Sequence, residues 1–314
     1  MVAVSVCKDS NKISSDIPKN YIWHLTFFDK TVSLAVFEHI NQIHSWVISQ
    51  RALGLTVGFV PTMGALHAGH QSLVKRALLD CDRVVVSIFV NPTQFNNADD
   101  LLKYPRTLAN DIELLKQSDC HAVFCPAISE MYLESEKTTH WDFGLLSTSL
   151  EGHFRPGHFD GVLTIVKKLF LAVAPDKAFF GEKDFQQLAL IQKMTLEEKL
   201  PVQVVACPTV REASGLAMSS RNARLTPQQH NIALNISRVL LAAAGMGRSV
   251  HPKELEEWAT NQLKSVEGLR LEYCALVNAA RFDIPTHWTE EDCVLLVAAF
   301  VGEIRLIDNV IVSQ

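Results

Sequence analysis

The fold is decided by residues 55–90, LTVGFVPTMGALHAGHQSLVKRALLDCDRVVVSIFV. An apolar, β-branched run at 55–62 predicts a buried strand that ends at Pro61, and a similar run at 83–90 predicts a second strand. Between them, residues 69–80 have the apolar spacing of a helix. A strand, a helix and a strand in this order form a βαβ unit, which places both strands parallel in one sheet.

The same alternation continues outward from this unit. Upstream, apolar residues recur at helical spacing from Thr31 to Arg51, which predicts a helix there. Downstream we expect helices at 107–119, 161–174 and 185–199, and strands at 121–126, 177–181 and 202–210. The pattern predicts an α/β fold with a Rossmann-like parallel sheet, in which ligands bind at the carboxyl ends of the strands.

The residue types change after about position 224. Two amphipathic helices are expected at 225–245 and 252–266, each with a proline near its start. Three strands follow, at 269–279, 293–301 and 303–312, and we expect them to form an antiparallel sheet. The chain is therefore predicted to consist of an N-terminal extension (1–33), a Rossmann-like parallel-sheet domain (34–209) and a smaller C-terminal α+β domain (210–314).

Composition and charge exclude several classes of protein. The chain is 48% hydrophobic and 20% charged, as expected for a protein with a sizeable core, and its net charge of -5 disfavours nucleic acid as a partner. Apolar runs such as 169–174 are too short to span a membrane, and the N-terminus lacks the apolar core of a signal peptide. The seven cysteines are an odd number without a CxxC pair, which indicates a reducing compartment. We therefore expect a cytoplasmic protein.

The turn after the first strand carries the strongest chemical signal, VPTMGALHAGHQSLV at 60–74. A helix that begins near Gly69 presents unpaired N–H groups and partial positive charge, which suit a phosphate chain. His67 and His70 flank this glycine, and histidine donors there can stabilise charge that develops on phosphate oxygens. An HxxH pair can also be two surface histidines or part of a metal site, but zinc would need further ligands and no cluster supplies them.

Two later segments combine cations with hydroxyl or carboxylate groups. Lys183, in GEKD at the end of an expected strand, suits a charge that shifts during phosphoryl or adenylyl transfer, although taken alone it is more often a solvated turn lysine. SSRN at 219–222 places two hydroxyls beside the guanidinium of Arg221, which makes an anion clamp or, alternatively, a helix cap.

A third segment, NPTQF at 91–95, begins just past the second expected strand. Asn91 and Gln94 can both donate and accept hydrogen bonds, which suits a substrate with hydroxyls and a carboxylate. An Asn-Pro turn is the alternative, and it can hold for Asn91 while Gln94 binds the substrate.

At this point a family resemblance can be stated. HAGH is similar to the HIGH-type sequence of the nucleotidyltransferase superfamily, and VPTMGALHAGH as a whole resembles the pantothenate synthetase family. Ala68 and Ser214 depart from residues common in that family, and the extension at 1–33 matches nothing in it. Six later segments match in the family's order: SIFVNPTQF (87–95), YPRT (104–107), HFDGVLTIVKKLF (158–170), FFGEKDFQQL (179–188), PTVREASGLAMSSRN (208–222) and RLIDN (305–309).

The resemblance implies an ATP-dependent ligase that condenses pantoate with β-alanine through a pantoyl adenylate and releases AMP and pyrophosphate. It makes residues 34–209 the catalytic domain that binds ATP and pantoate, and residues 210–314 a lid. It assigns catalysis to His67, His70, Lys183, Ser219 and Arg221. It assigns pantoate binding to Asn91, Gln94 and Gln187, Mg²⁺ to Asp111, the ribose to Asp184, and it suggests a homodimer. The residues it gives to ATP are Pro61, Thr62, Met63, Gly64, His67, Gly69, His70, Gly181, Lys183, Asp184, Val210, Met218, Ser219, Ser220 and Arg221.

Three other functions share parts of this pattern. Another nucleotidyltransferase would share HxGH and the Ser/Arg loop, but it has no reason to carry NPTQF or GEKDFQQ. A nucleotide-binding regulator without catalysis would be suggested by loss of Lys183 or His70, and both are present. An RNA-binding module is disfavoured by the acidic balance of the chain.

Overall fold

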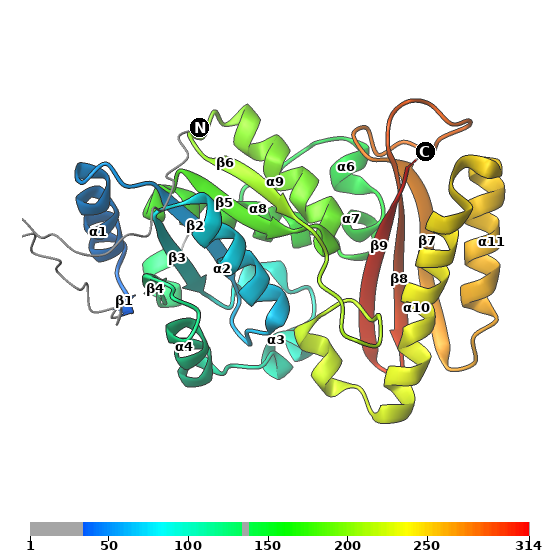
Figure 1. The fold of residues 1–314 in the computed structure, drawn as a ribbon, viewed down its shortest axis with the longest axis horizontal. Helices are drawn as coiled ribbons and strands as arrows, with labels where there is room; N and C mark the ends of the chain where they lie inside the picture. Colours follow the sequence, from blue (N-terminus) through cyan, green and yellow to red (C-terminus); the bar gives the residue numbers. More distant parts are fainter. Residues whose placement is uncertain (1–33, 134–137, 314) are drawn as a thin grey trace, which may run out of the picture. The chain divides into compact units, whose positions relative to one another are not determined.

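A computed structural model describes residues 34–133 and 138–313 of the chain (Figure 1). The predicted extension at 1–33 lies outside the described residues. The described part contains a six-stranded and a three-stranded sheet. All strands of the larger sheet pair in parallel, and those of the smaller sheet pair antiparallel, as the sequence predicts.

The parallel sheet has the strand order β1-β4-β3-β2-β5-β6. The chain proceeds from β2 outward to β3 on one side, and β5 pairs with β2 on the other side. A crevice for ligands is expected outside the carboxyl ends of strands where the order reverses in this way. The strands are β1 (Ala35–Phe37), β2 (Val57–Thr62), β3 (Arg83–Ile88), β4 (Ala122–Phe124), β5 (Lys177–Gly181) and β6 (Gln203–Cys207).

Helices cover both faces of this sheet. Since successive strand residues point to opposite faces, one strand packs against helices on both. Val57 and Phe59 of β2 pack with α1, α8 and α9, whereas Val60 packs with α2 and α4 on the other face. The longer helices are α1 (Ile40–Ala52), α2 (Ala68–Asp80), α4 (Leu108–Lys116), α8 (His158–Val173) and α9 (Phe185–Glu197). The short helical segments are η1 (Pro92–Gln94), α3 (Ala98–Lys103), α5 (Ile128–Met131), α6 (Leu145–Thr148), α7 (Glu151–Phe154), η2 (Glu182–Asp184), η3 (Ser220–Arg224) and η4 (Gly247–Ser249).

The helix predicted over 31–51 is wrong in its first part. Residues 35–37 form the edge strand β1, which pairs in parallel with β4, and α1 begins only at Ile40. The sequence AVF fits the pleated edge of a sheet as well as one face of a helix, so apolar spacing alone could not distinguish the two. The sheet is thus one strand wider than the alternation predicts.

The C-terminal sheet is buried on both faces. Leu295 and Val297 of β8 pack under the two helices that precede the sheet, and Val294 and Leu296 join the core of the parallel sheet. The division at 209/210 stays a prediction, because the described residues form one compact unit. Its elements are α10 (Pro227–Met246), α11 (Pro252–Lys264), β7 (Leu269–Asn278), β8 (Cys293–Val301) and β9 (Ile304–Val312).

Within the described ranges, no helix combines the length and the apolar character needed to traverse a bilayer. The cysteines of these ranges are free thiols, at Cys81, Cys120, Cys125, Cys207, Cys274 and Cys293.

Candidate active site

Two adjoining cavities lie at the carboxyl ends of β2, β3 and β5. The first, of about 190 Å³, brings together most residues predicted to bind ATP: Met63, His67, Gly69, His70, Gly181, Lys183, Asp184, Val210, Met218, Ser219, Ser220 and Arg221. The second, of about 210 Å³, contains Pro61 and Thr62 together with the predicted pantoate residues Asn91, Gln94 and Gln187. Met63, His70, Gly181 and Asp184 line both cavities. Residues far apart in the sequence therefore converge on one place, whereas Gly64 and Asp111 line neither cavity.

The two histidines cap the N-terminus of α2. The Nδ1 atom of His67 accepts a hydrogen bond from the Gly69 N–H at 3.1 Å, and Nδ1 of His70 accepts one from the His67 N–H at 3.3 Å. Since both Nδ1 atoms are acceptors, each neutral ring carries its proton on Nε2. Each ring can therefore donate a hydrogen bond from Nε2 to a phosphate oxygen. The close approach needs glycine at position 69, because a Cβ there would lie 2.8 Å from the His67 ring.

Both histidines are held in the neutral form. Burial lowers the pKa of His70 to about 3, and the nearby His67 and Lys183 act in the same direction. Burial and the charge of Lys183 also lower the pKa of His67. In this form each ring keeps one N–H, on Nε2, which it can donate to an anionic oxygen at neutral pH.

Lys183 lies in η2, directly after β5. Its ammonium is 3.9 Å from the Asp184 carboxylate, and its side chain is only 18% exposed. The C-terminal sheet fixes this turn, since Nδ2 of Asn309 donates to the carbonyls of Glu182 and Lys183 at 2.9 and 2.8 Å. The RLIDN segment thus holds the backbone that carries the cation.

Residues 219–221 begin the 3-10 helix η3. The Ser219 hydroxyl accepts a hydrogen bond from the Arg221 N–H at 3.2 Å, so the cap that the sequence offered as an alternative is present. Both residues nevertheless line the first cavity. The guanidinium of Arg221 pairs with Asp100 of α3 at 2.9 Å. The cap and the anion clamp are compatible, because the capping Ser219 hydroxyl only accepts there and can still donate its own O–H, while the Arg221 guanidinium takes no part in the cap.

In the second cavity, Asn91 and Gln94 differ in how their amides are used. The Asn91 side chain is 1% exposed and donates to the Gly161 carbonyl at 3.1 Å, while its oxygen accepts from the Tyr132 hydroxyl at 2.8 Å. Nδ2 of Asn91 also donates to Oε1 of Gln94 at 3.2 Å, whereas Nε2 of Gln94 faces the sulfur of Met63. Asn91 therefore orients Gln94. α8 and β5 contribute an apolar wall that includes Val162, Ile165, Val166, Leu169 and Phe180.

Asp111, the predicted magnesium ligand, lies on α4 and lines neither cavity. Its carboxylate is 3% exposed and accepts hydrogen bonds from the backbone N–H groups of Ala65 and Leu66 at 2.9 and 2.8 Å. The Thr107 hydroxyl donates to the same carboxylate at 3.2 Å. These partners fix the loop between β2 and α2 and leave the oxygens occupied, so Asp111 does not fit a magnesium site. Within the described residues, no group of three His, Cys, Asp or Glu side chains is placed to hold a metal.

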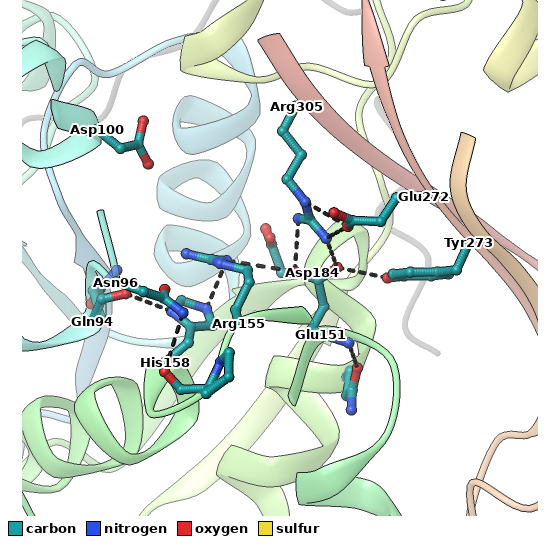
Figure 2. Close-up of polar contacts among 12 residues, drawn as sticks. Gln94, Asn96, Asp100, Glu151, Arg155, His158, Asp184, Glu272, Tyr273 and Arg305 are labelled. Carbon is teal, nitrogen blue, oxygen red and sulfur yellow. Dashed lines mark hydrogen bonds and ion pairs between the residues drawn. The ribbon is translucent and has the colours of Figure 1, made fainter. Parts of the chain in front are cut away.

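A buried charge network behind the cavities was missed by the sequence analysis. Arg305 of β9 donates to Glu151 of α7 at 2.7 and 2.9 Å, and also pairs with Glu272 of β7 (Figure 2). The Tyr273 hydroxyl donates to Glu151 at 2.7 Å. Burial would raise the pKa of Glu151, but the hydrogen bonds and charge of Arg305, helped by Tyr273, lower it to about 2. The clustering of Glu, Arg and His in EGHFRPGH (151–158) was the available signal.

The network reaches the second cavity through His158. Arg155 approaches Glu151 to 3.5 Å and contacts Nε2 of His158 at 2.9 Å, while Nδ1 of His158 lies 2.8 Å from the Gln94 carbonyl (Figure 2). Since arginine only donates, Nε2 accepts from it and Nδ1 donates to the carbonyl. Burial and the charge of Arg155 lower the pKa of His158 to about 3, which keeps this arrangement neutral. The backbone of Gln94 is therefore tied to the C-terminal sheet.

Comparisons with known proteins agree with this geometry. The family model described as pantoate-beta-alanine ligase matches residues 35–311. The chain is similar to pantothenate synthetases of Phocaeicola vulgatus (47% identity, 88% of this chain and 99% of that protein) and Rubrobacter xylanophilus (48%, 82% and 92%).

Two solved structures resemble the fold over nearly its whole length. A pantothenate synthetase from Thermus thermophilus has a TM-score of 0.83 and 38% identity, and the match covers 90% of this chain and 100% of that one. A pantoate-beta-alanine ligase from Francisella tularensis, complexed with beta-gamma ATP and beta-alanine, has a TM-score of 0.74 and 35% identity, with 88% and 97% covered.

Proposed function

The chain belongs to the pantoate-beta-alanine ligase family, and on that premise we propose that its two adjoining cavities hold ATP and pantoate side by side. As a member of this family it is an enzyme that uses ATP to join pantoate to β-alanine. The observation that carries the proposal is the shared boundary of the cavities, formed by Met63, His70, Leu73, Tyr104, Gly181 and Asp184. Across such a boundary the carboxylate of one substrate can meet the α-phosphorus of the other.

The first half-reaction forms the adenylate. The pantoate carboxylate attacks the α-phosphorus of ATP, the bond to the bridging oxygen breaks, and pyrophosphate leaves. Negative charge moves onto the leaving phosphates, and the Nε2–H groups of His67 and His70 and the ammonium of Lys183 line the cavity in which this occurs. Ser219 and Arg221 line its other side and are assigned to the departing pyrophosphate.

The second half-reaction forms the amide. The amine of β-alanine attacks the acyl carbon of pantoyl adenylate and AMP leaves, so no protein nucleophile is needed. Gln94 and Gln187 are assigned to the polar groups of pantoate, and the apolar wall of α8 is assigned to its methyl groups. The protein's contribution in both steps is to position the reactants and to stabilise charge.

Three further assignments belong to this proposal. Mg²⁺ is assigned to the nucleotide as part of the MgATP substrate, because Asp111 does not fit as its ligand and no step above depends on the metal. A homodimer is proposed on the family resemblance, and sedimentation of the purified protein tests it. A cytoplasmic location is supported by the free thiols of the described chain, since such thiols persist in a reducing compartment.

Isotope exchange between pyrophosphate and ATP tests the adenylation site. The purified enzyme is incubated with MgATP and labelled pyrophosphate, with and without pantoate, in the absence of β-alanine. Exchange that depends on pantoate establishes the adenylate half-reaction. Binding of ATP without pantoate-dependent exchange would contradict the assignment of both cavities.

A further inference from the structure

Arg221, which is assigned to the departing pyrophosphate, already has an anionic partner within the protein. Its Nη2 lies 2.9 Å from Oδ2 of Asp100, and Nη1 of Arg224 lies 3.8 Å from the other oxygen of the same carboxylate. One carboxylate thus pairs with two arginines of η3.

The pair stands between two cavities. Arg221 lines the ATP cavity and also a third cavity of about 520 Å³, whose lining includes Asp100, Arg155, Arg224 and Arg305. Arg155 pairs with the Glu151 carboxylate, and Arg305 pairs with that of Glu272. Figure 2 draws no contact between Asp100 and this network. Among these arginines, the one that lines the ATP cavity is therefore held by Asp100.

The same two segments also meet at the ATP cavity. Tyr104, one residue past α3, lines this cavity together with Ser220 and Arg221. The residues from Asp100 to Tyr104 follow the NPTQF segment, which carries Gln94. The pantoate side of the site thus contacts the pyrophosphate side through α3.

The ion pair is weak enough to exchange. The side chains of Arg221 and Asp100 are 30% and 31% exposed, so water screens their attraction and each can move. A triphosphate or pyrophosphate carries several negative charges and can bond a guanidinium through two oxygens, which favours it over a single carboxylate. Displacement of Asp100 would leave its carboxylate in contact with solvent rather than buried without a partner.

We propose that Asp100 is a positioning residue that holds Arg221 in the free enzyme, yields it to the phosphates of ATP, and takes it back when pyrophosphate leaves. The inference rests on the proposed role of Arg221 in binding the leaving group. It makes the carboxylate a competitor of pyrophosphate for one guanidinium. Asp100 thereby weakens the binding of the product and favours its departure after adenylate formation.

The test measures the half-saturating pyrophosphate concentration in pantoate-dependent pyrophosphate–ATP exchange at saturating MgATP and pantoate. Asp100→Asn removes the competitor, so this concentration is expected to fall about two- to fivefold, the effect of one half-exposed ion pair. Asp99→Asn is the matched control, because it removes the same charge from the neighbouring position. Asp100→Glu keeps the charge and is expected to remain close to the wild-type value.

The outcomes separate this inference from the proposed function. If Asp100→Asn raises the half-saturating concentration, or changes it no more than Asp99→Asn does, the competition does not exist and the inference is overturned. Arg221→Ala tests the premise, since it is expected to raise the same concentration at least tenfold. An unchanged value in Arg221→Ala would overturn the role of Arg221 itself. An unaltered KM for pantoate in Asp100→Asn shows that the variant is folded.

Discussion

Arg305 donates to Glu151 at 2.7 Å, although 154 positions separate the two residues in the chain. The arginine belongs to β9 and the glutamate to the short helix α7. The next helix, α8, lines the pantoate cavity. Through Arg155 and His158 the same pair reaches the backbone of Gln94. The NPTQF segment (91–95), which carries Gln94, is therefore positioned by β9. This strand contributes no residue to the pantoate cavity.

Replacement of Glu151 by Gln is expected to lower the free energy of unfolding by roughly 3 kcal/mol at neutral pH, because it leaves part of the Arg305 charge buried without its partner. The folded pKa of Glu151 is about 2, below the ordinary value of 4.5, so the unfolded chain binds the proton more readily. The stabilisation is complete above pH 4.5 and is lost as the pH falls towards 2. Denaturant titrations of wild type and Glu151→Gln at several pH values measure this difference in the free energy of unfolding.

The control for that series is Glu257→Gln, which alters an exposed helix pair with Lys253. It is expected to change the stability by less than about 0.5 kcal/mol at every pH. A constant difference between wild type and Glu151→Gln from neutral pH down to the folded pKa of about 2 would show that the Glu151 carboxylate is not held ionised by Arg305.

Lys183→Ala is expected to reduce the rate of adenylate formation about 10²- to 10³-fold, since one preorganised charge that stabilises the leaving phosphates is removed. Pantoate affinity is expected to change much less, because Lys183 lines the ATP cavity and not the pantoate cavity. Rapid-quench measurement of the adenylate separates the two effects, with Lys193→Ala of α9 as the control. Equal losses in rate and in pantoate affinity would argue against this role.

Gly161→Ala is expected to raise the KM for pantoate at least tenfold and to lower stability by about 1–3 kcal/mol. A Cβ at this position of α8 would lie 2.4 Å from the Thr93 carbonyl oxygen and 2.7 Å from the Gln94 nitrogen, so the backbone of η1 must move. Gly245→Ala in α10 is the matched control, since nothing lies within 4 Å of its added methyl group. Normal pantoate kinetics in Gly161→Ala would mean that the position of Gln94 is not critical.

The pKa values of His158 and His140 are expected to depart from the usual 6.5 in opposite directions. Burial and Arg155 lower the pKa of His158 to about 3, whereas the hydrogen bond and charge of Asp160 raise the pKa of the exposed His140. NMR titration of the imidazole resonances should show His158 neutral throughout the range around neutral pH and His140 protonating above pH 6.5. Because the unfolded chain binds protons more readily at position 158, this residue's contribution to stability is full above pH 6.5 and declines towards pH 3. A His158 resonance that titrates near pH 6.5 would contradict the assigned hydrogen bonds.

The sequence predicted the parts of this site that are local. His67 and Lys183 each follow an apolar strand by a few residues, and the carboxyl ends of neighbouring parallel strands meet at one edge of the sheet. Apolar periodicity likewise predicted nearly every long helix and strand. The edge strand β1 was missed because three residues are too few to distinguish a strand from the start of a helix.

The residues that were missed act over long distances in the chain. Nothing near Arg305 in the sequence indicates that its partner is Glu151, and nothing near Asp100 points to Arg221. Such pairs depend on how separate elements pack, which a single sequence does not encode in its local pattern. Asp111 shows the converse: its place matched a family role, but the two N–H groups beside it give the carboxylate another function.

The shared core has a consequence for how the molecule melts. Tyr273, Val294 and Leu296 of the antiparallel sheet belong to the same apolar cluster as Phe170 and Leu190, which cover the parallel sheet. Elements that share one interior lose it together, so heating is expected to produce a single cooperative calorimetric transition for these two sheets. A nucleotide that binds only the folded enzyme raises that one melting temperature. Occupancy of the ATP cavity would then protect even the far C-terminal strands from proteolysis.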